Sequence, residues 1–343
     1  MMEEIILETS SQRTEILLGE SLSNLEKYIP TNRKPIIITD DNIYSLYKKE
    51  LSKYNTIVIG TGEKIKNLKT IDTIIGKLLE LEIDRKSFIV GVGGGIVCDI
   101  TGFVASIFMR EIGFGFVSTT LLSQVDASIG GKNGVNYDSY KNIVGVINQP
   151  DFVICDFEML KTLPKKELMN GMAEIIKHAV IGNLSYFEYI EDNYMSILGL
   201  DPYLIHELVK QSVIIKNQIV EIDEHELGER KKLNFGHTVG HAIEKLSGIE
   251  HGSAVAIGMI IESEFSVQKG MLKREDTDRI KSLIQRVGLP TKLNLDKSKL
   301  FEAIKKDKKR DGDSIYFIFL SQIGNSLIGK ITLKELEEQL LSI

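Results

Sequence analysis

Apolar and polar positions alternate differently in the two halves of the chain. In the first half, short β-branched runs predict strands at residues 36–39, 56–59, 87–90, 115–118 and 152–155. A helical stretch at residues 68–81 lies between two of these runs. Strands that alternate with helices are typical of a parallel sheet with crossover connections. The first half therefore predicts an α/β domain.

The pattern changes after Pro164, where apolar residues recur at helical spacing. They do so over residues 167–248 and 255–286, with Gly and Pro confined mostly to the joints. A short strand at residues 314–320 is the only extended piece expected in this half. We place the boundary near residue 160, giving an α/β domain at 1–160 and a mainly α-helical domain at 161–343, with the active site expected in the crevice between them.

Composition excludes several classes of protein. The 343 residues carry a formal net charge of −6, so the totals imply no basic face for nucleic acid. Cys98 and Cys155 are the only cysteines and form no CxxC or Cys/His motif, which indicates reduced thiols. The start of the chain is acidic where a signal peptide would be basic, and no apolar run reaches membrane-spanning length. We therefore expect a cytoplasmic protein that binds neither membrane nor nucleic acid.

Three separated segments carry a candidate metal site. They are residues 171–178 (GMAEIIKH), 233–241 (LNFGHTVGH) and 251–252 (HG). Glu174, His237 and His251 supply one carboxylate oxygen and two imidazole nitrogens, a set that holds a divalent metal and leaves a coordination position open. Because an open position distinguishes a catalytic site from a structural one, the chain is predicted to be a metal-dependent enzyme.

A glycine-rich turn in the first half suggests a nucleotide site. Gly93, Gly94 and Gly95 follow a strand and open a helix, where backbone N–H groups and the helix dipole favour a pyrophosphate. The dinucleotide fingerprint is incomplete, because Ile96 replaces its last Gly and no acid lies about twenty residues on. Such a turn is as typical of packing as of cofactor binding. Polar residues at the ends of other strands favour the prediction of a Rossmann-like nucleotide-binding domain. They are Asp40, Asn42, Glu63, Lys66, Thr119 and Thr120.

An ordered series of motifs resembles the 3-dehydroquinate synthase family. It begins with residues 118–136 (STTLLSQVDASIGGKNGVN) and Lys141-Asn142, and continues through residues 159–164 (MLKTLP). The Glu174 helix, the GHTVGH segment and residues 307–309 (DKK) complete it. The resemblance covers nearly the whole chain, and so long an ordered series does not arise by chance.

The resemblance implies a cytoplasmic homodimer of the shikimate pathway with bound NAD and a zinc or cobalt ion. Its sugar phosphate substrate is 3-deoxy-D-arabino-heptulosonate 7-phosphate, and its products are 3-dehydroquinate and phosphate. NAD oxidises a ring hydroxyl, phosphate leaves by elimination, and the ketone is reduced again. An intramolecular aldol step then closes the ring, so NAD ends unchanged.

The resemblance also implies roles for individual residues. Lys177 would reach substrate hydroxyls from the face of the helix that carries Glu174. Lys216 and Arg230 match the residues that bind the substrate carboxylate, and His241 matches the proton-transfer partner near the phosphate. Residues matching the surroundings of the phosphate and ring are Asn234, Lys132, Asn142, Arg110 and Lys309, with Arg110 expected from the neighbouring subunit and Lys308 an alternative to Lys309. Matches on the cofactor side are Asp99, Leu122, Asp126, Lys132, Lys141 and Thr162.

The chain departs from the family pattern at three places. Glu111 stands where the family usually has Gly, Ser118 replaces a usual Pro, and the segment between His241 and His251 is short. The rivals are a 2-deoxy-scyllo-inosose synthase-like cyclase, a metal- and NAD-dependent alcohol or glycerol dehydrogenase, and a nonenzymatic NAD-binding protein. Arg230 and Asn234 favour 3-dehydroquinate synthase over the first, and the metal triad argues against the last.

Overall fold

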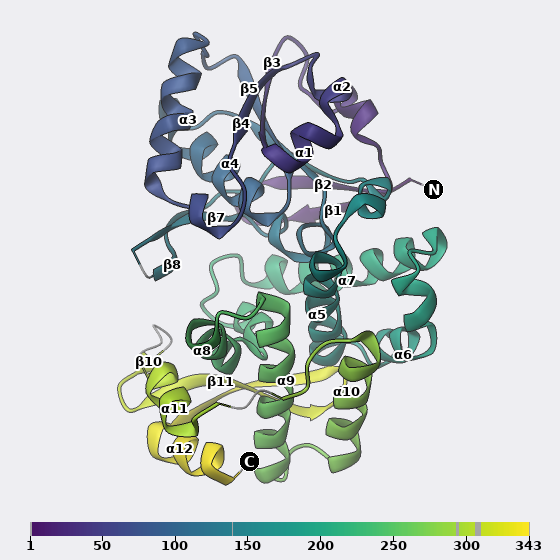
Figure 1. The fold of residues 1–343 in the computed structure, drawn as a ribbon, viewed down its shortest axis with the longest axis vertical. Coiled ribbons are helices and arrows are strands. Elements are labelled where there is room, and N and C mark those ends of the chain that lie inside the picture. Colours follow the sequence, from purple (N-terminus) through teal and green to yellow (C-terminus); the bar gives the residue numbers. More distant parts are fainter. Residues whose placement is uncertain (1, 139, 293–294, 306–309, 343) are drawn as a thin grey trace. The chain divides into compact units, whose positions relative to one another are not determined.

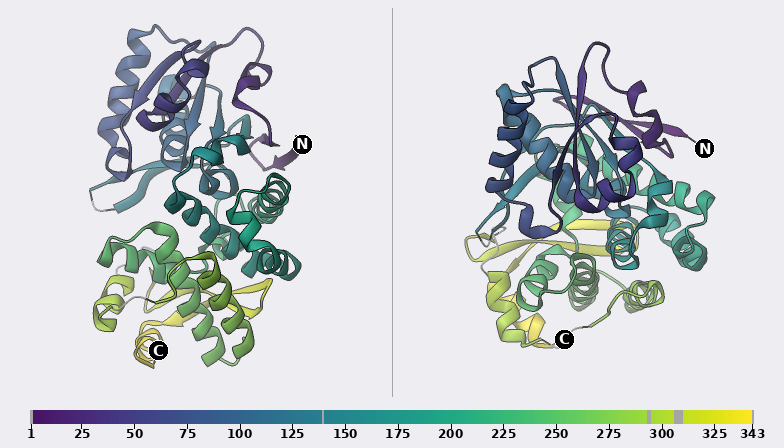
Figure 2. Two further views of the ribbon diagram at one scale, coloured as in Figure 1. Left: turned by 45° about the vertical axis from the view of Figure 1, so that its right-hand side comes forward. Right: turned by 45° about the horizontal axis from the view of Figure 1, so that its top comes forward.

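The computed structural model of the chain describes residues 2–138, 140–292, 295–305 and 310–342. The chain forms two compact units, Met1–Pro164 and Lys165–Ile343 (Figures 1 and 2). Among the described residues, no helix is both long enough and apolar enough to cross a membrane.

The first unit is an α/β structure. Its elements are β1 (Glu3–Glu8), β2 (Arg13–Leu18), η1 (Leu22–Lys27), β3 (Lys34–Asp40), α1 (Asp41–Leu46), α2 (Lys48–Leu51), β4 (Asn55–Ile59), η2 (Glu63–Ile65), α3 (Leu68–Glu80), β5 (Ser87–Gly93), α4 (Gly95–Ile107), η3 (Phe108–Arg110), β6 (Phe114–Ser118), η4 (Ser123–Ala127), β7 (Lys132–Tyr137), β8 (Tyr140–Ile147), β9 (Phe152–Cys155) and η5 (Phe157–Thr162).

The main sheet of this unit confirms the predicted parallel strands. Within the described residues it has seven strands in the order β1-β2-β9-β6-β5-β3-β4. All neighbours from β2 to β4 pair in parallel, and only β1 and β2 pair antiparallel. Every residue of β5 is buried, as expected of a central strand covered on both faces. The hairpin of β1 and β2 and the separate hairpin of β7 and β8 were not predicted.

The second unit is mainly helical. Its elements are α5 (Lys165–Gly182), α6 (Leu184–Leu198), α7 (Pro202–Ile222), η6 (Glu229–Asn234), α8 (His237–Ser247), α9 (His251–Gln268), α10 (Arg274–Val287), α11 (Lys297–Lys305), β10 (Arg310–Asp311), β11 (Ser314–Gln322), β12 (Asn325–Thr332) and α12 (Leu333–Ser342).

The expectation of a single late strand is wrong. In the part of the chain that the structure describes, β10, β11 and β12 form a three-stranded antiparallel sheet. Alternate residues of β11, including Ile315, Phe317 and Phe319, pack into a core with Phe265 of α9. The sequence of β12 shows no clear strand pattern, because half of its residues are exposed, one of its two buried residues is Ser326, and it contains Gly329. Tertiary packing against β11 therefore decides its conformation.

The turn after η3 explains the glycine that the family usually has there. Met109, Arg110 and Glu111 all have positive φ, and Glu111 has φ 99° and ψ 126°. Only glycine adopts this conformation without a steric penalty. The departure at Glu111 therefore places strain of about 1–3 kcal/mol beside Arg110.

We expect Glu111→Gly to stabilise the protein. The substitution removes the strain, although glycine loses more conformational entropy on folding, so the free energy of unfolding should rise by about 1 kcal/mol. The measurement is the urea midpoint, which should increase. Lys77→Gly, placed within α3 where glycine has no conformational advantage, should lower it by roughly 0.5–1 kcal/mol. Equal signs for the two variants would contradict the argument.

Candidate active site

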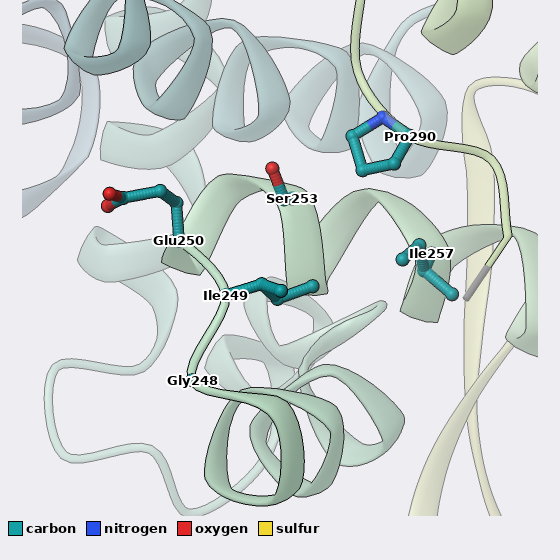
Figure 3. Close-up of a pocket in the computed structure, with 6 residues that line it drawn as sticks. All are labelled: Gly248, Ile249, Glu250, Ser253, Ile257 and Pro290. Atoms are coloured by element: carbon teal, nitrogen blue, oxygen red, sulfur yellow. The ribbon is translucent and has the colours of Figure 1, made fainter. Parts of the chain in front are cut away.

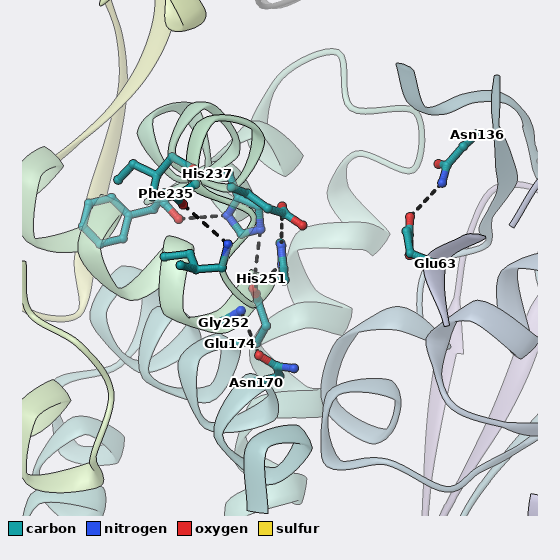
Figure 4. Close-up of polar contacts among 12 residues, drawn as sticks. Glu63, Asn136, Asn170, Glu174, Phe235, His237, His251 and Gly252 are labelled. Carbon is teal, nitrogen blue, oxygen red and sulfur yellow. Dashed lines mark hydrogen bonds and ion pairs between the residues drawn. The ribbon is translucent and has the colours of Figure 1, made fainter. Parts of the chain in front are cut away.

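The carboxylate of Glu174 is the centre of the site in the second unit. Glu174 lies in α5 and is fully buried. Its Oε1 lies 3.4 Å from His237 Nε2 and 3.4 Å from His251 Nε2 (Figure 4). Its Oε2 forms an ion pair with Lys177. The two oxygens thus have separate partners, one facing both imidazoles and the other facing the lysine.

These distances fit a bound divalent ion. The three donor atoms all lie within 4.8 Å of one another. Two ligands that each lie about 2.0–2.1 Å from a tetrahedral zinc are separated by roughly 3.4 Å. That separation matches the 3.4 Å found between the oxygen and each nitrogen. One carboxylate and two imidazoles also leave room for a substrate oxygen.

Charged neighbours shift the pKa values of Glu174 and His251 in opposite directions. Burial alone would raise the pKa of Glu174, but Lys177, His237 and His251 outweigh it and hold that pKa well below its usual range. Burial also opposes a charged His251, yet the carboxylates of Glu174 and Glu244 raise the pKa of this imidazole to about 9. In the metal-free protein, the positive charge of a protonated His251 therefore compensates part of the negative charge of Glu174, as a bound cation would.

The second nitrogen of each histidine has its own partner. His237 Nδ1 lies 3.1 Å from the backbone oxygen of Phe235, and His251 Nδ1 lies 3.4 Å from Glu244 Oε2. A partner of this kind fixes the ring and keeps Nε2 available as the ligand atom. In addition, the Asn170 side chain accepts a hydrogen bond of 3.0 Å from Gly252 N–H, which joins α5 to the start of α9.

Both histidines of the candidate metal site are the first residues of helices that touch closely. His237 begins α8 and His251 begins α9. A Cβ atom at Gly258 of α9 would lie 2.0 Å from the backbone oxygen of Gly236, so the two helices approach backbone to backbone. Only three residues, 248–250, join the helices, in keeping with the short segment expected there. This packing brings the two imidazoles to a ring-centroid separation of 5.4 Å.

Other residues predicted to contact substrate lie on elements of the same unit that pack against α5 or carry the histidines. His241 lies one turn after His237, at a ring-centroid distance of 5.2 Å. Arg230 and Asn234 lie on η6, which packs against α5 and α7, and Lys216 lies on α7. Arg230 is only 2% exposed, and its Nη1 donates to the backbone oxygen of Glu224. Asn234 donates to Glu226, a neighbour that sequence reasoning missed.

The first unit brings its candidate nucleotide residues to one edge of the sheet. The chain passes from β3 to β4 on one side and from β5 to β6 on the other, so the strand order reverses between β3 and β5. Asp40 ends β3, and Gly93 ends β5. Open α/β sheets bind ligands at this kind of reversal. Here Thr119 N–H donates to the backbone oxygen of Gly93, which links the ends of β5 and β6.

A polar network crosses this edge. Lys66 forms an ion pair with Asp99 and donates a 2.6 Å hydrogen bond to Asn142 Oδ1. Asn142 was expected near substrate and the other two near the cofactor, and the structure brings these three side chains together. Glu63 accepts a 2.8 Å hydrogen bond from Asn136 (Figure 4). A pocket of about 410 Å³ beside the network has a lining that includes Glu63, Lys66, Asn136 and Lys141.

The remaining predicted residues of this unit occupy varied positions. Asp40 caps α1 by accepting from Ile43 N–H at 3.0 Å, and Thr162 donates to the backbone oxygen of Met159. The others lie as follows: Asn42 in α1, Arg110 in η3, Leu122 just before the π-helical η4, Asp126 within η4, Lys132 in β7, and Thr120 in a reciprocal contact with Ser123. Lys308 and Lys309 lie outside the described residues.

A second pocket begins next to His251 and includes none of the three candidate metal ligands. Figure 3 shows this pocket of about 320 Å³, lined by Gly248, Ile249, Glu250, Ser253, Ile257 and Pro290. Its lining offers a single carboxylate and no imidazole. The convergence of donors on Glu174 is therefore the stronger indication of chemistry in this unit.

Sequence reasoning missed the residues that hold the ligands in place. Asn170 lies four residues before Glu174, and Glu244 lies seven residues after His237. These spacings place Asn170 on the face of α5 that carries Glu174, and Glu244 on the face of α8 that carries His237. The contacts themselves go elsewhere, because Glu244 contacts His251 and Asn170 accepts from Gly252 N–H. This periodicity is a usable signal, although it does not say which of several residues on the face contacts the ligand.

Two family models match the chain in succession. The 3-dehydroquinate synthase N-terminal model matches residues 56–170, and the 3-dehydroquinate synthase C-terminal model matches residues 171–310. The chain belongs to the 3-dehydroquinate synthase family. Its relatives include the 3-dehydroquinate synthase of Thermoanaerobacter pseudethanolicus, which is 42% identical over 336 residues that cover 94% of this chain and 93% of that protein.

Solved structures of other enzymes have a fold similar to that of this chain. A 2-deoxy-scyllo-inosose synthase complexed with carbaglucose-6-phosphate, NAD⁺ and Co²⁺ has a TM-score of 0.88 at 26% identity, with 99% of each chain covered. A probable glycerol dehydrogenase from Sinorhizobium meliloti has a TM-score of 0.65 at 16% identity, covering 94% of this chain and 93% of that one. The second likeness is one of fold alone. As a family member, the chain is a cyclising lyase and not a simple dehydrogenase.

We expect zinc binding to the metal-free protein to release a proton from His251. Its pKa of about 9 means that the imidazole is charged at neutral pH, whereas a ligand imidazole must be neutral. Glu174, with its lowered pKa, is already ionised and contributes no proton. The release should therefore be present below pH 9 and decline as the pH rises through about 9.

Calorimetry in buffers of different ionisation enthalpy, at about pH 7.5 and about pH 9.5, measures this release. Ionisation of a metal-bound water would increase with pH, the opposite trend. His251→Ala should abolish the decline, while His225→Ala, at an exposed position, should leave it unchanged. A release that stays constant or grows in the unsubstituted protein would contradict the prediction.

Proposed function

We propose that this chain converts 3-deoxy-D-arabino-heptulosonate 7-phosphate to 3-dehydroquinate and phosphate, with bound NAD and one divalent metal held by Glu174, His237 and His251. The observation that carries the proposal is the close approach of the His237 and His251 Nε2 atoms to Glu174 Oε1. It occurs in a chain whose family membership rests on matches along most of its length. Zinc and cobalt both suit this donor set.

When bound, the metal supplies Lewis-acid polarisation of a substrate hydroxyl, and NAD supplies reversible hydride acceptance. Lys177 is held on Glu174 Oε2, the oxygen that does not face the histidines. Its ammonium group therefore lies beside the ligand set and can donate to a substrate hydroxyl. His241, one turn along the same helix face as His237, presents an imidazole that can exchange a proton near the phosphate.

The substrate carboxylate is assigned to Arg230 and Lys216. Arg230 offers a planar fork and sits in a buried position that already orders its guanidinium through Glu224. Lys216 lies 5% exposed on the neighbouring helix α7. A guanidinium and an ammonium group that are both buried, on elements η6 and α7 that pack together, suit an anionic substrate group. This supports 3-dehydroquinate synthesis over cyclisation of a substrate that lacks a carboxylate.

NAD is assigned to the carboxyl edge of the parallel sheet, with the pyrophosphate at the start of α4. The supporting observation is the strand-order reversal between β3 and β5, with Gly93–Gly95 at the end of β5. Asp40, Asn42, Glu63, Lys66, Asp99, Thr119, Thr120, Leu122, Asp126, Lys132, Lys141 and Thr162 complete the proposed contacts. Asn142 and Lys132 would also meet the substrate.

The proposal extends to a cytoplasmic homodimer. Arg110 is exposed on η3, and we assign it to the phosphate in the site of a neighbouring subunit. Cys98 and Cys155 are free and buried, and burial raises the pKa of both thiols, which keeps them unreactive. Two unpaired thiols are consistent with a reducing compartment.

The deciding assay follows phosphate release from the heptulosonate phosphate. We expect turnover to require NAD in catalytic amount only, with no accumulation of NADH at steady state, because the hydride is returned within each cycle. Absorbance of NADH and released phosphate are measured together. Conversion of one NAD to NADH per turnover would instead show a dehydrogenase. Phosphate release without any NAD would exclude transient oxidation.

Arg230→Ala tests the substrate carboxylate. Loss of one partner of a desolvated charge pair costs roughly 2–5 kcal/mol, so kcat/KM should fall by roughly 30-fold to several thousandfold. Arg230→Lys should restore it only in part, because an ammonium cannot reproduce the fork. Metal and NAD content should stay unchanged. The wild type should reject an analogue that lacks the carboxylate, and Arg230→Ala should lose that discrimination. Equal losses on both substrates would make Arg230 structural.

A further inference from the structure

The helix that carries His237 begins without a cap of its own. Its N-cap residue is Gly236, which has φ 77° and no side chain to accept from the first N–H groups of α8. No larger residue fits there, because a Cβ atom would lie 2.6 Å from Met259 Cγ and 2.9 Å from the backbone oxygen of Val255. The close contact with α9 therefore deprives α8 of the Ser, Thr, Asn or Asp that helices normally use.

The missing cap comes from Glu262 of α9. Its Oε2 accepts from Gly236 N–H at 2.8 Å, and its Oε1 lies 3.3 Å from Val239 N–H, which donates to it. These are the N–H groups that a capping box satisfies within one helix. Here a single carboxylate from the neighbouring helix serves both. Glu262 follows Gly258 by one turn, so both residues lie on the face of α9 that contacts α8.

We propose that Glu262 is a positioning residue of the metal site, acting through the backbone at the start of α8. Its two hydrogen bonds bracket His237, since one goes to the residue before the ligand and the other to the second residue after it. Glu262 is fully buried, so its charge is not screened by water, and the positive end of the α8 dipole stabilises it. This inference rests on the proposed metal site, which it extends to the support of one ligand.

A role in helix stability alone would make different predictions. Removing a cap typically lowers stability by about 1 kcal/mol wherever the helix begins. Here the unsatisfied N–H groups adjoin a metal ligand whose ring is also held by the Phe235 oxygen, on the other side of Gly236. A shift of this backbone segment moves Nε2 relative to Glu174. Metal affinity and ligand geometry are therefore the informative quantities.

The test compares Glu262→Gln, Glu262→Asp and Glu264→Gln. Glutamine keeps the shape but offers one acceptor and turns its amide donor toward a backbone N–H group. Aspartate keeps the charge on a shorter stem. Glu264 lies two residues along the same helix and pairs with Arg274 in an exposed contact, so its substitution controls for loss of charge from α9.

The metal-free proteins are titrated with Zn²⁺ in competition with a chromogenic chelator, and the Co²⁺ forms are examined by their visible absorption. We expect Glu262→Gln to weaken Zn²⁺ binding by roughly 10- to 100-fold, as loss of an outer-sphere partner does elsewhere. Its Co²⁺ bands should shift or lose intensity. Glu262→Asp should show an intermediate loss and decides the question if the glutamine variant does not fold. Glu264→Gln should match the wild type.

Two outcomes would overturn the inference. If the Glu262 variants lose thermal stability but keep wild-type Zn²⁺ affinity and Co²⁺ bands, the residue is only a helix cap. If Glu264→Gln weakens Zn²⁺ as much as Glu262→Gln, the effect is one of overall charge. A wild-type protein that binds neither ion would refute the proposed metal site itself, which is a separate failure from either of these.

Discussion

The backbone contact between α8 and α9 is the constraint on which the site in the second unit depends. A Cβ atom at Gly236 would lie 2.9 Å from the backbone oxygen of Val255, and one at Gly258 would lie 2.0 Å from that of Gly236, so neither position accepts a side chain. At Gly240 a Cβ atom would lie 3.1 Å from the backbone of Ala254 and Val255, which is a tight contact. Since His237 and His251, the proposed ligands, begin these helices, the backbone contact sets the separation of the two histidines. The glycines of the GHTVGH segment thus act through helix packing, and they bring the imidazoles to the carboxylate carried by α5.

That carboxylate serves two neighbours at once. Glu174 Oε1 faces both histidines, and Oε2 faces Lys177 on the next turn of α5. A fully buried anion is costly without a compensating positive charge. In the metal-free protein, the ammonium group of Lys177 and the imidazole of His251, which its raised pKa keeps protonated, provide that charge. A divalent ion would take over the part played by the His251 proton and leave the lysine in place. Metal occupancy and proton balance are therefore linked by the same geometry.

The sequence predicted the parts of the fold that depend on local pattern. The central parallel strands β5, β6 and β9 are apolar runs buried on both faces, and helix α3 begins at the expected Leu68. Strand β12 and the neighbours of the ligands were missed because distant segments decide them. Asn170 reaches Gly252, and Lys66 reaches Asn142, across more than seventy residues of chain. Spacing can place a residue on a helix face, but it does not reveal which partner folds against that face.

The two glycine-rich segments differ in what they say about function. A Cβ atom at Gly93, Gly94 or Gly95 would meet the side chains of Val97, Thr120 or Ala127, respectively, within 3.0 Å. Packing alone thus explains why this turn needs glycine, whether or not a pyrophosphate is bound. Packing does not explain a fully buried carboxylate oxygen placed 3.4 Å from two imidazole nitrogens, since burial of such groups is costly without a cation or proton among them. The functional assignment therefore rests on the acid and the two histidines. The glycine turn supports a nucleotide site only when it is considered together with them.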